Sequence, residues 1–336
     1  MSHKISDAKR AIAEDGKIKT HVGGQALIEG VMMRGRYNWA MAVREPNGEM
    51  FVMEEDLASG KNKNSWMYWP IIRGCRALVE SLTLGYKALS IATEKAFPEE
   101  TKSKCAKNAE ESSKSGTDWV TTLSMIFGIV IGIALFIVAP ALITNILVGD
   151  YQDKTMLWNI VDGVIRLAIF VLYLWLIGRM SDVKRMFAYH GAEHKTIHCY
   201  EHGLELTPQN ARSFTRLHIR CGTAFMLMVM IIAILVYTII PIQWFVEQLG
   251  FSQGVVSMAL ILAIRVALMP LIAGISYEIT VKWAGNRPEN PVVQFILWPG
   301  LQLQYLTTNE PDDSQLECAI EAMKLVLKRE QAQAYN

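Results

Sequence analysis

The sequence has no strong excess of charge of either sign and no regular cysteine pattern. Its 336 residues include 33 Lys and Arg against 32 Asp and Glu, which gives a formal net charge of +1. This balance provides no basic field for nucleic acid, so we expect no nucleic-acid partner. The five cysteines are odd in number and scattered without a C-x-x-C pair. We therefore expect reduced thiols and not a disulfide framework.

A leader segment and a phosphate-binding loop are also missing. The first twenty residues are polar and charged, and they lack an apolar core followed by a small-residue cleavage site. We therefore expect no cleavable signal peptide. The glycine-rich segment 23–35 lacks the pattern G-x-x-x-x-G-K-[ST], which favours tight turns over a nucleotide site.

Long apolar runs are abundant instead. Hydrophobic residues make up 51% of the chain and concentrate between residues 119 and 277. A helix needs roughly 20 apolar residues to cross a membrane. Four stretches meet this need: 119–149, 157–180, 223–245 and 255–277. We therefore predict a mainly α fold, that of a polytopic membrane protein with about four transmembrane helices and a small N-terminal β-containing cytoplasmic portion.

Pro140 and the charged residues Asp162, Arg166 and Arg265 lie inside the predicted spans. Pro140 predicts a kink or a break near the end of the first span. Asp162 and Arg166 are four residues apart and can pair on one helix face. A charge such as Arg265 is costly in mid-membrane, so we expect it to face Asp162 or a polar cavity. A structural ion pair is the first interpretation, and a transport pathway is the second.

Lysines and arginines concentrate in the segments on one side of the predicted spans. The stretch 179–222 holds seven, whereas the two other connections hold one and none. Positive residues mark the cytoplasmic side. We therefore expect a multi-pass protein whose N- and C-termini are cytoplasmic, together with the histidine-rich segment.

The remaining sequence divides the chain into five predicted parts. They are a flexible lead (1–20), a cytoplasmic β-hairpin segment plus an interfacial helix (21–97), a linker (98–117), a four-helix transmembrane region with a cytoplasmic histidine-rich loop at 179–222 (118–280), and a cytoplasmic C-terminal amphipathic segment (281–336). The motif Pro46-Asn47-Gly48 between alternating runs predicts the hairpin. The apolar stretch 292–306 is short for a span, so we expect a re-entrant or surface-lying segment. Ser314 and Glu317 have the spacing of a capping box for a terminal helix.

Five of the seven histidines lie between residues 190 and 218. His190, Glu193 and His194 form the pattern H-x-x-E-H, and on a helix both imidazoles share one face. In the inverted zinc-protease pattern the histidines bind the metal and the glutamate acts as general base. We therefore expect a helix ending near Gly203, with His190 and His194 as ligands of a divalent metal, zinc first, and with Glu193 as the catalytic residue.

A zinc site needs a third protein ligand, and a catalytic one keeps a further position open. The residues alone leave this ligand undecided among four candidates: Glu29, His218, Cys221 and Glu278. Short patterns also arise by chance, and histidines near a membrane surface are often interfacial. A structural zinc site or a hydrogen-bonded histidine core therefore remains an alternative.

Five motifs resemble a known family. They are GGQALIEGVMMRG (23–35), YHGAEHKTIHCYE (189–201), RLHIRCGTAF (216–225), LIAGISYEI (271–279) and LTTNEPDD (306–313). The chain resembles the YqhQ-like membrane family, a bacterial group catalogued as domain of unknown function 1385, over residues 21–327. Ile219 stands where family members often have proline, which affects the local turn more than the chemistry.

The resemblance implies a predicted metal-dependent protein of the cell inner (cytoplasmic) membrane, without an assigned reaction. The positions that it marks are Gln25, Glu29 and Arg34, the metal candidates His190, His194, His198, His218, Cys221 and Glu278, and the catalytic candidate Glu193.

Three functions follow as hypotheses. The first is a cytoplasm-facing, metal-dependent enzyme of hydrolytic type. The second is a non-catalytic membrane scaffold or regulator, in which the histidines form a structural metal site or a hydrogen-bonded cluster. The third is a transporter that uses Asp162 and Arg265. The expected partners are the lipid bilayer and an unidentified substrate or protein, and a homo-oligomer is left open.

Overall fold

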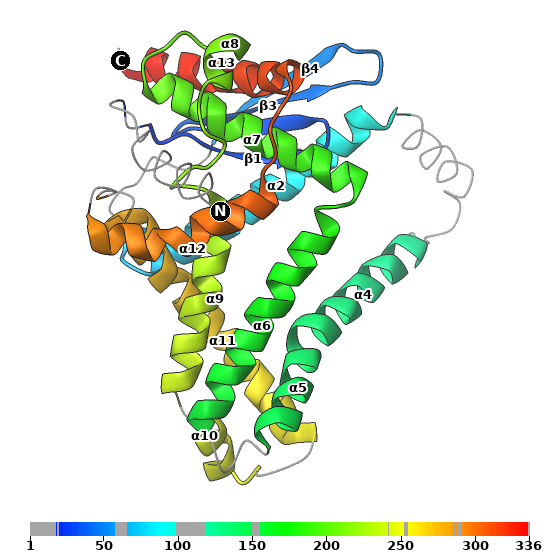
Figure 1. Cartoon of the computed structure of the whole chain (residues 1–336), viewed down its shortest axis with the longest axis vertical. Coiled ribbons are helices and arrows are strands. Elements are labelled where there is room, and N and C mark those ends of the chain that lie inside the picture. The colour runs from blue at the N-terminus through cyan, green and yellow to red at the C-terminus, as the bar shows by residue number, and fades with distance from the viewer. Residues whose placement is uncertain are drawn as a thin grey trace.

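A computed structural model describes residues 18, 20–57, 66–98, 119–149, 155–240, 242–251, 255–284, 287 and 290–334. Nearly all of the predicted lead and linker lies outside the described residues. The described chain forms a bundle of long helices with a layered unit of sheet and helices at one end (Figure 1).

The bundle confirms the membrane prediction. Four helical stretches of the described chain are long and apolar enough to cross a membrane: 126–148, 156–177, 222–239 and 259–283. They lie in α4 (Trp119–Ile133) continuing into α5 (Ala139–Val148), in α6 (Thr155–Ile177), in α9 (Gly222–Ile239), and in α11 (Val255–Tyr277) with the π-helical segment Glu278–Trp283 that follows it. Their outward side chains are apolar and exposed, as expected of surfaces that contact lipid.

Two details of the spans differ from expectation. Pro140 does not break the first span. It lies in the first turn of α5, where its missing N–H is tolerated, and a π-helical turn at Ala134–Val138 precedes it. The third span ends at Ile239 and not near residue 245, because α9 ends there and a separate short helix, α10, occupies Ile242–Gln248.

The charged residues inside the bundle lie together. Arg166 donates to Asp162 at 2.7 Å, which confirms the predicted pair. The guanidinium of Arg265 lies 5.3 Å from the ring centre of Tyr237. Asp162, Arg166 and Arg265 line one cavity of about 90 Å³. Arg265 thus lines a mainly apolar cavity together with Asp162, which agrees with the expectation that it faces Asp162 and not with the alternative of a polar cavity.

The N-terminal strands form a four-stranded antiparallel meander. The strands are β1 (Gly23–Leu27), β2 (Gly30–Arg34), β3 (Asn38–Arg44) and β4 (Met50–Asp56), and they pair in sequence order. The predicted hairpin is β3–β4, with Met41 opposite Met53 and Gly48 at φ 87° in the turn. This confirms the β-containing portion.

Each face of the sheet is covered by helices. Trp39 and Met41 on β3 pack against α2 (Ile72–Ala96), whereas Ala40 and Ala42 belong to the core shared with α7 (Ser181–Glu201) and α13 (Asp313–Ala334). Alternation along the strand therefore gives one sheet two separate cores. In Figure 1, α7 and α13 run close together beside the sheet at the end of the bundle.

The terminal helix α13 begins with a different cap from the one predicted. The backbone N–H of Gln315 donates to Asp312 Oδ1 at 2.9 Å, and the backbone N–H of Asp312 donates to Gln315 Oε1 at 3.0 Å. This reciprocal pair is the capping box. The predicted box of Ser314 and Glu317 is wrong, because Glu317 instead pairs with Arg44 of β3 at 2.8 Å.

The apolar stretch near residue 300 is a helix, α12 (Pro291–Thr307). A separate short helix, α8 (Pro208–Arg212), lies between α7 and α9. Helix α12 packs against α9 and α6 and crosses the end of α9 (Figure 1). The apolar side chains of Val292, Phe295 and Trp298 remain exposed on it. The stretch is thus helical, and its expected place at the membrane surface or as a re-entrant segment stays a prediction.

Candidate metal centre

Helix α7 carries most of the predicted site. Although its sequence is polar, it is buried on every side from Phe187 to Cys199. A methyl group on Gly191 would lie 2.1 Å from the carbonyl oxygen of Asn309, so only glycine permits this close approach. Polar groups that are buried in this way need partners, which makes their hydrogen bonds informative.

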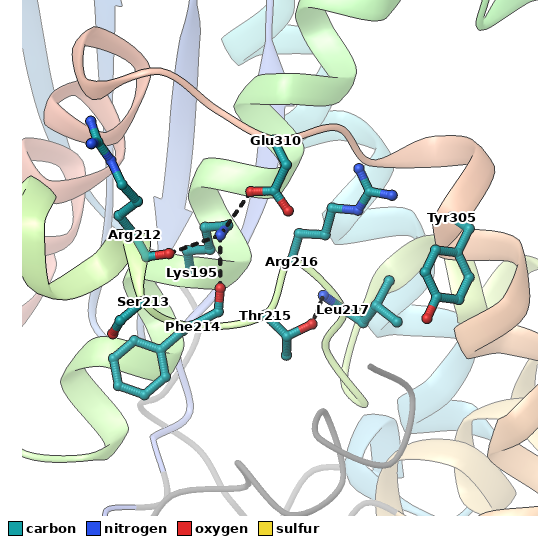
Figure 2. A pocket seen from close by; sticks show the side chains of 9 residues that line it. All are labelled: Lys195, Arg212, Ser213, Phe214, Thr215, Arg216, Leu217, Tyr305 and Glu310. Atoms are coloured by element: carbon teal, nitrogen blue, oxygen red, sulfur yellow. Dashed lines mark hydrogen bonds and ion pairs between the residues drawn. The ribbon is translucent and has the colours of Figure 1, made fainter. Parts of the chain in front are cut away.

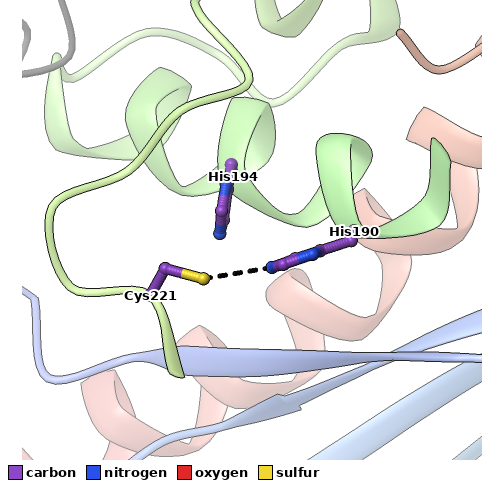
Figure 3. Close-up of side chains that lie close together, drawn as sticks. All are labelled: His190, His194 and Cys221. Carbon is purple, nitrogen blue, oxygen red and sulfur yellow. Dashed lines mark hydrogen bonds between the residues drawn. The ribbon is translucent and has the colours of Figure 1, made fainter. Parts of the chain in front are cut away.

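The first group of candidate ligands consists of His190, His194 and Cys221. One ligand atom from each of the three lies within 4.8 Å of the other two. Figure 3 shows the two imidazoles projecting from neighbouring turns of α7 toward the thiol, which lies on the segment that leads into α9. The structure thus brings together the two histidines of the H-x-x-E-H pattern and one of the candidate third ligands.

Backbone carbonyls orient both imidazoles of this group. His190 Nδ1 lies 2.7 Å from Thr307 O, and His194 Nδ1 lies 2.6 Å from Arg216 O. A carbonyl only accepts, so each Nδ1 carries the proton and donates. Metal-binding histidines show the same arrangement, because it leaves Nε2 with its lone pair. His194 Nε2 is buried without a hydrogen-bond partner in the described part of the chain.

The thiol and the nearest imidazole form a charged pair. His190 Nε2 lies 3.2 Å from Cys221 Sγ. Burial acts to raise the pKa of Cys221, but His190 and His194 bring that pKa well below its usual value. Burial acts to lower the pKa of His190, whereas the Cys221 thiolate raises it to about 9. The site therefore favours a thiolate, which is the form of cysteine that binds metal.

Glu193 projects from α7 toward β1. A methyl group on Gly24 would lie 2.7 Å from Glu193 Cδ, and the backbone N–H of Gly24 donates to the carboxylate. Burial raises the pKa of Glu193 above its usual value, partly offset by His190 and His194. Its Oε2 has no partner among the residues described. A buried carboxyl with a raised pKa and an open oxygen is suited to proton transfer.

A second group lies one turn further along α7. His198, Glu201 and His218 also bring one ligand atom each within 4.8 Å of the others. Arg220, however, pairs with Glu201 Oε1. This guanidinium already neutralises the carboxylate, which weakens its attraction for a cation.

The hydrogen bonds of the second group also differ from those of the first. The backbone N–H of Arg220 donates to His218 Nδ1 at 3.3 Å, so the proton of His218 lies on Nε2, which is 3.8 Å from Glu201 Oε2. His198 Nε2 donates to Leu217 O at 2.9 Å. Burial, reinforced by His198 and Arg220, lowers the pKa of His218 well below its usual value. These contacts hold both rings in place, although His218 Nε2 and Glu201 Oε2 have no hydrogen-bond partner among the described residues.

Helix α12 fixes the segment that supports both groups. The fully buried Gln304 accepts from the backbone N–H of His218 at 2.8 Å and donates to the carbonyl of His218 at 2.8 Å. This pair of bonds holds the chain between Arg216 and Cys221 against α12. The carbonyls of Arg216 and Leu217 are thereby kept in place for the imidazoles of α7.

Glu278 lies outside both groups. Its carboxylate forms two hydrogen bonds with the guanidinium of Arg73 on α2, and it also accepts from the backbone N–H of Ile71 at 3.3 Å. The expected role as completing ligand therefore has no support in the position of this side chain, because an arginine already occupies both carboxylate oxygens. Glu278 instead joins α2 to the end of the last span.

The marked residues of the first motif lie around the metal candidates but do not join them. Glu29, at φ 52° in the β1–β2 turn, pairs with Arg185 and accepts from the hydroxyl of Tyr189 at 3.2 Å. Arg34 pairs with Glu80 of α2 at 2.9 Å. Gln25 lies against Gly85 of α2, on the opposite face of the sheet from Glu193. These residues fasten the sheet to α7 and α2.

Sequence reasoning missed two parts of the site. Gly24 contacts Glu193, and the adjacent glycines at 23–24 were the only signal of a close approach. The carbonyls of Arg216 and Thr307 orient the imidazoles. Because every residue has a backbone carbonyl, no sequence motif predicts which one will accept such a hydrogen bond.

The first group fits a transition-metal ion. It offers two imidazole nitrogens and one thiolate, a set that zinc prefers. The carbonyl-bound Nδ1 atoms and the unpartnered His194 Nε2 are the features of this chain that agree with such an ion.

Comparison with known proteins places the chain in a family. Residues 69–329 match the family described as protein of unknown function (DUF1385). A protein of Bacillus subtilis (strain 168), described as the uncharacterized protein YqhQ, is 29% identical over 326 residues, which is 95% of this chain and 96% of that protein. No solved structure matches the chain. The family match covers α2 to α13, both histidine groups included, and the chain belongs to the DUF1385 family.

Proposed function

We propose that this protein is an integral-membrane, metal-dependent hydrolase. His190, His194 and Cys221 would hold a divalent metal, zinc first, and Glu193 would act as the general base. The observation that carries the proposal is the pair of Nδ1–H donations to Arg216 O and Thr307 O, which direct both Nε2 atoms toward Cys221.

The donor set supports catalysis more than a structural role. Structural zinc sites are closed by four ligands, whereas catalytic ones have three protein ligands and an open position. Three candidate ligands gather here within the described chain. Glu193 interacts with both imidazoles and with the thiolate, and its Oε2 remains unpaired by any described residue.

The chemistry follows from these positions. When bound, the metal would lower the pKa of a coordinated water and polarise a carbonyl or phosphoryl oxygen. Glu193 would accept a proton from the attacking water at Oε2 and return it to the leaving group. Gly24 would hold the other carboxylate oxygen through its backbone N–H. The buried setting of α7 would exclude bulk water from this transfer.

The second candidate is a membrane regulator with a structural metal at the same residues. Glu193 decides between the two, because in a structural site it would serve as the fourth ligand. The purified protein in lipid nanodiscs is expected to contain one zinc per chain. His194→Ala and Cys221→Ala should remove it, and the control Cys75→Ser, on α2, should keep it.

Glu193→Gln should retain the metal and abolish hydrolysis in a panel of carboxylic ester, amide and phosphoester substrates. Loss of metal in Glu193→Gln would favour the structural site. Absence of stoichiometric metal from the wild type would exclude both candidates.

We also propose that the centre faces the cytoplasm of a bacterial cell, in the inner membrane. The support is the excess of Lys and Arg in 179–222, which forms α7, α8 and the segment before α9. Reporter fusions after residue 334 and within 150–154 test this arrangement. The first should be active only as a cytoplasmic reporter and the second only as an external one.

A further inference from the structure

A polar cavity of about 270 Å³ lies beside the metal centre. Its walls are α7 at Lys195, the segment from Arg212 to Leu217, the end of α12 at Tyr305, and Glu310 (Figure 2). Nothing in the proposed hydrolysis uses this cavity. It is smaller than the range of about 300–1,000 Å³ typical of sites for drug-sized molecules, so it suits one compact polar group.

The charges around the cavity do not balance. Lys195 is satisfied, because its Nζ donates to Arg212 O at 3.1 Å and Phe214 O at 2.7 Å and pairs with Glu310 at 2.8 Å. The guanidinium of Arg212 pairs with Asp313. Arg216 has no carboxylate partner in the described chain.

The guanidinium of Arg216 faces the ring of Tyr305, 5.8 Å from its centre. Figure 2 shows it between Glu310 and Tyr305. A half-buried guanidinium without a counter-charge is suited to an anion.

The cavity is lined by residues that lie next to a candidate membrane span and on α12. Arg216 precedes Gly222, the first residue of a membrane span, by six positions. Tyr305 belongs to α12, whose apolar Phe295 and Trp298 are exposed. Arginines next to a span and amphipathic surface helices both occur at the membrane interface, where anionic lipid headgroups gather.

We propose that this cavity binds a phosphate group through Arg216, with an anionic phospholipid headgroup as the source that its position favours. A guanidinium fork matches two phosphate oxygens. The hydroxyl-bearing side chains of Thr215 and Tyr305 line the same space. Its volume would take the headgroup and leave the acyl chains in the bilayer. This inference does not require the neighbouring centre to bind metal or to be catalytic.

The test is direct binding by the detergent-purified full chain, measured by isothermal titration calorimetry. The probes are short-chain phosphatidylglycerol, inorganic phosphate and short-chain diacylglycerol. Arg216→Gln should weaken phosphatidylglycerol binding about tenfold or more, because charge-assisted hydrogen bonds are lost. The matched control is Arg179→Gln, since Arg179 also lies at a span end over an aromatic ring, Trp175, but lies away from the cavity.

A second variant, which removes a negative charge from the cavity, keeps the test valid if Arg216→Gln folds poorly. Glu310 is the only carboxylate lining the cavity among the described residues, and its side chain is 67% exposed. Glu310→Gln should therefore tighten phosphatidylglycerol binding.

Each result has one meaning. If Arg216→Gln weakens phosphatidylglycerol and inorganic phosphate equally, and both bind the wild type equally well, the phosphate site stands. Its ligand would then be a soluble phosphate and not a lipid headgroup. Binding of diacylglycerol as tight as that of phosphatidylglycerol would overturn the proposal. Equal losses in the Arg216 and Arg179 variants, or weaker binding by Glu310→Gln, would overturn it as well.

Discussion

His194 and His198 lie one turn apart on α7, yet the groups to which they belong differ in where the protons are held. In the first group both Nδ1 atoms donate to backbone carbonyls, and no cationic side chain pairs with its members in the described chain. In the second group Arg220 neutralises Glu201, and its backbone N–H places the proton of His218 on Nε2. Similar residue types at similar distances thus hold their protons at different nitrogens, and this difference is why we propose the metal at the first group.

The largest expected difference between the groups is in metal content. His194→Ala should lose stoichiometric zinc, and His198→Ala should keep it, because His194 Nε2 has no partner among the described residues whereas His198 Nε2 donates to Leu217 O. Mass spectrometry of the metal in protein purified in nanodiscs measures this. In cobalt-substituted protein, the thiolate-to-metal absorption band should be lost with His194→Ala alone. Equal loss in both variants would show that the two groups form one site.

The second group is expected to matter for stability. Glu201→Gln removes the fully buried carboxylate that pairs with Arg220, which should cost up to about 3 kcal/mol. The unfolding midpoint in nanodiscs should fall while the metal content stays unchanged. Glu317→Gln is the matched control, since its pair with Arg44 is half exposed and should contribute less than about 1 kcal/mol. A drop in metal content with Glu201→Gln would contradict the separation of the groups.

Gln304 links the two groups, so its replacement should affect both moderately. Gln304→Leu keeps the side-chain volume but removes both bonds to the backbone of His218. We expect zinc affinity to fall about tenfold, as for other residues that support metal ligands. Competition with a chromophoric chelator measures this affinity. Gln302→Leu, at a half-buried position of the same helix, should leave it unchanged.

The smallest effect is expected at Glu278. Because its pair with Arg73 is partly exposed, Glu278→Gln should lower the free energy of unfolding by less than about 1 kcal/mol. Zinc content should not change. A variant without zinc would mean that Glu278 leaves Arg73 and completes the metal site in the loaded protein.

Hydropathy was sufficient to predict the bundle, because a span must be long and apolar wherever it packs. The helix that carries the histidines was also predictable, since His190 and His194 lie four residues apart. The enclosure of α7 was not, because its sequence is polar and the covering segments come from both ends of the chain.

The partners of single carboxylates were beyond sequence reasoning for a related reason. Glu278 and Glu193 are equally plausible ligands by residue type. Arg73 lies 205 positions from Glu278, so only the folded chain reveals that this carboxylate is occupied. The Asp312–Gln315 cap was missed because two overlapping spacings both fit, and Arg44 from β3 determined which one formed.

Helix α12 has a practical consequence for anyone who handles this protein. Phe295 and Trp298 are exposed on this helix, so detergent would cover them after extraction from the membrane. Its last residue, Thr307, accepts a hydrogen bond from His190 Nδ1. A harsh detergent that displaces this helix would therefore loosen an imidazole at its other end. A loss of zinc during purification would then be an effect of the detergent and not a property of the native protein. The metal content should therefore be measured in a preparation that retains bound lipid.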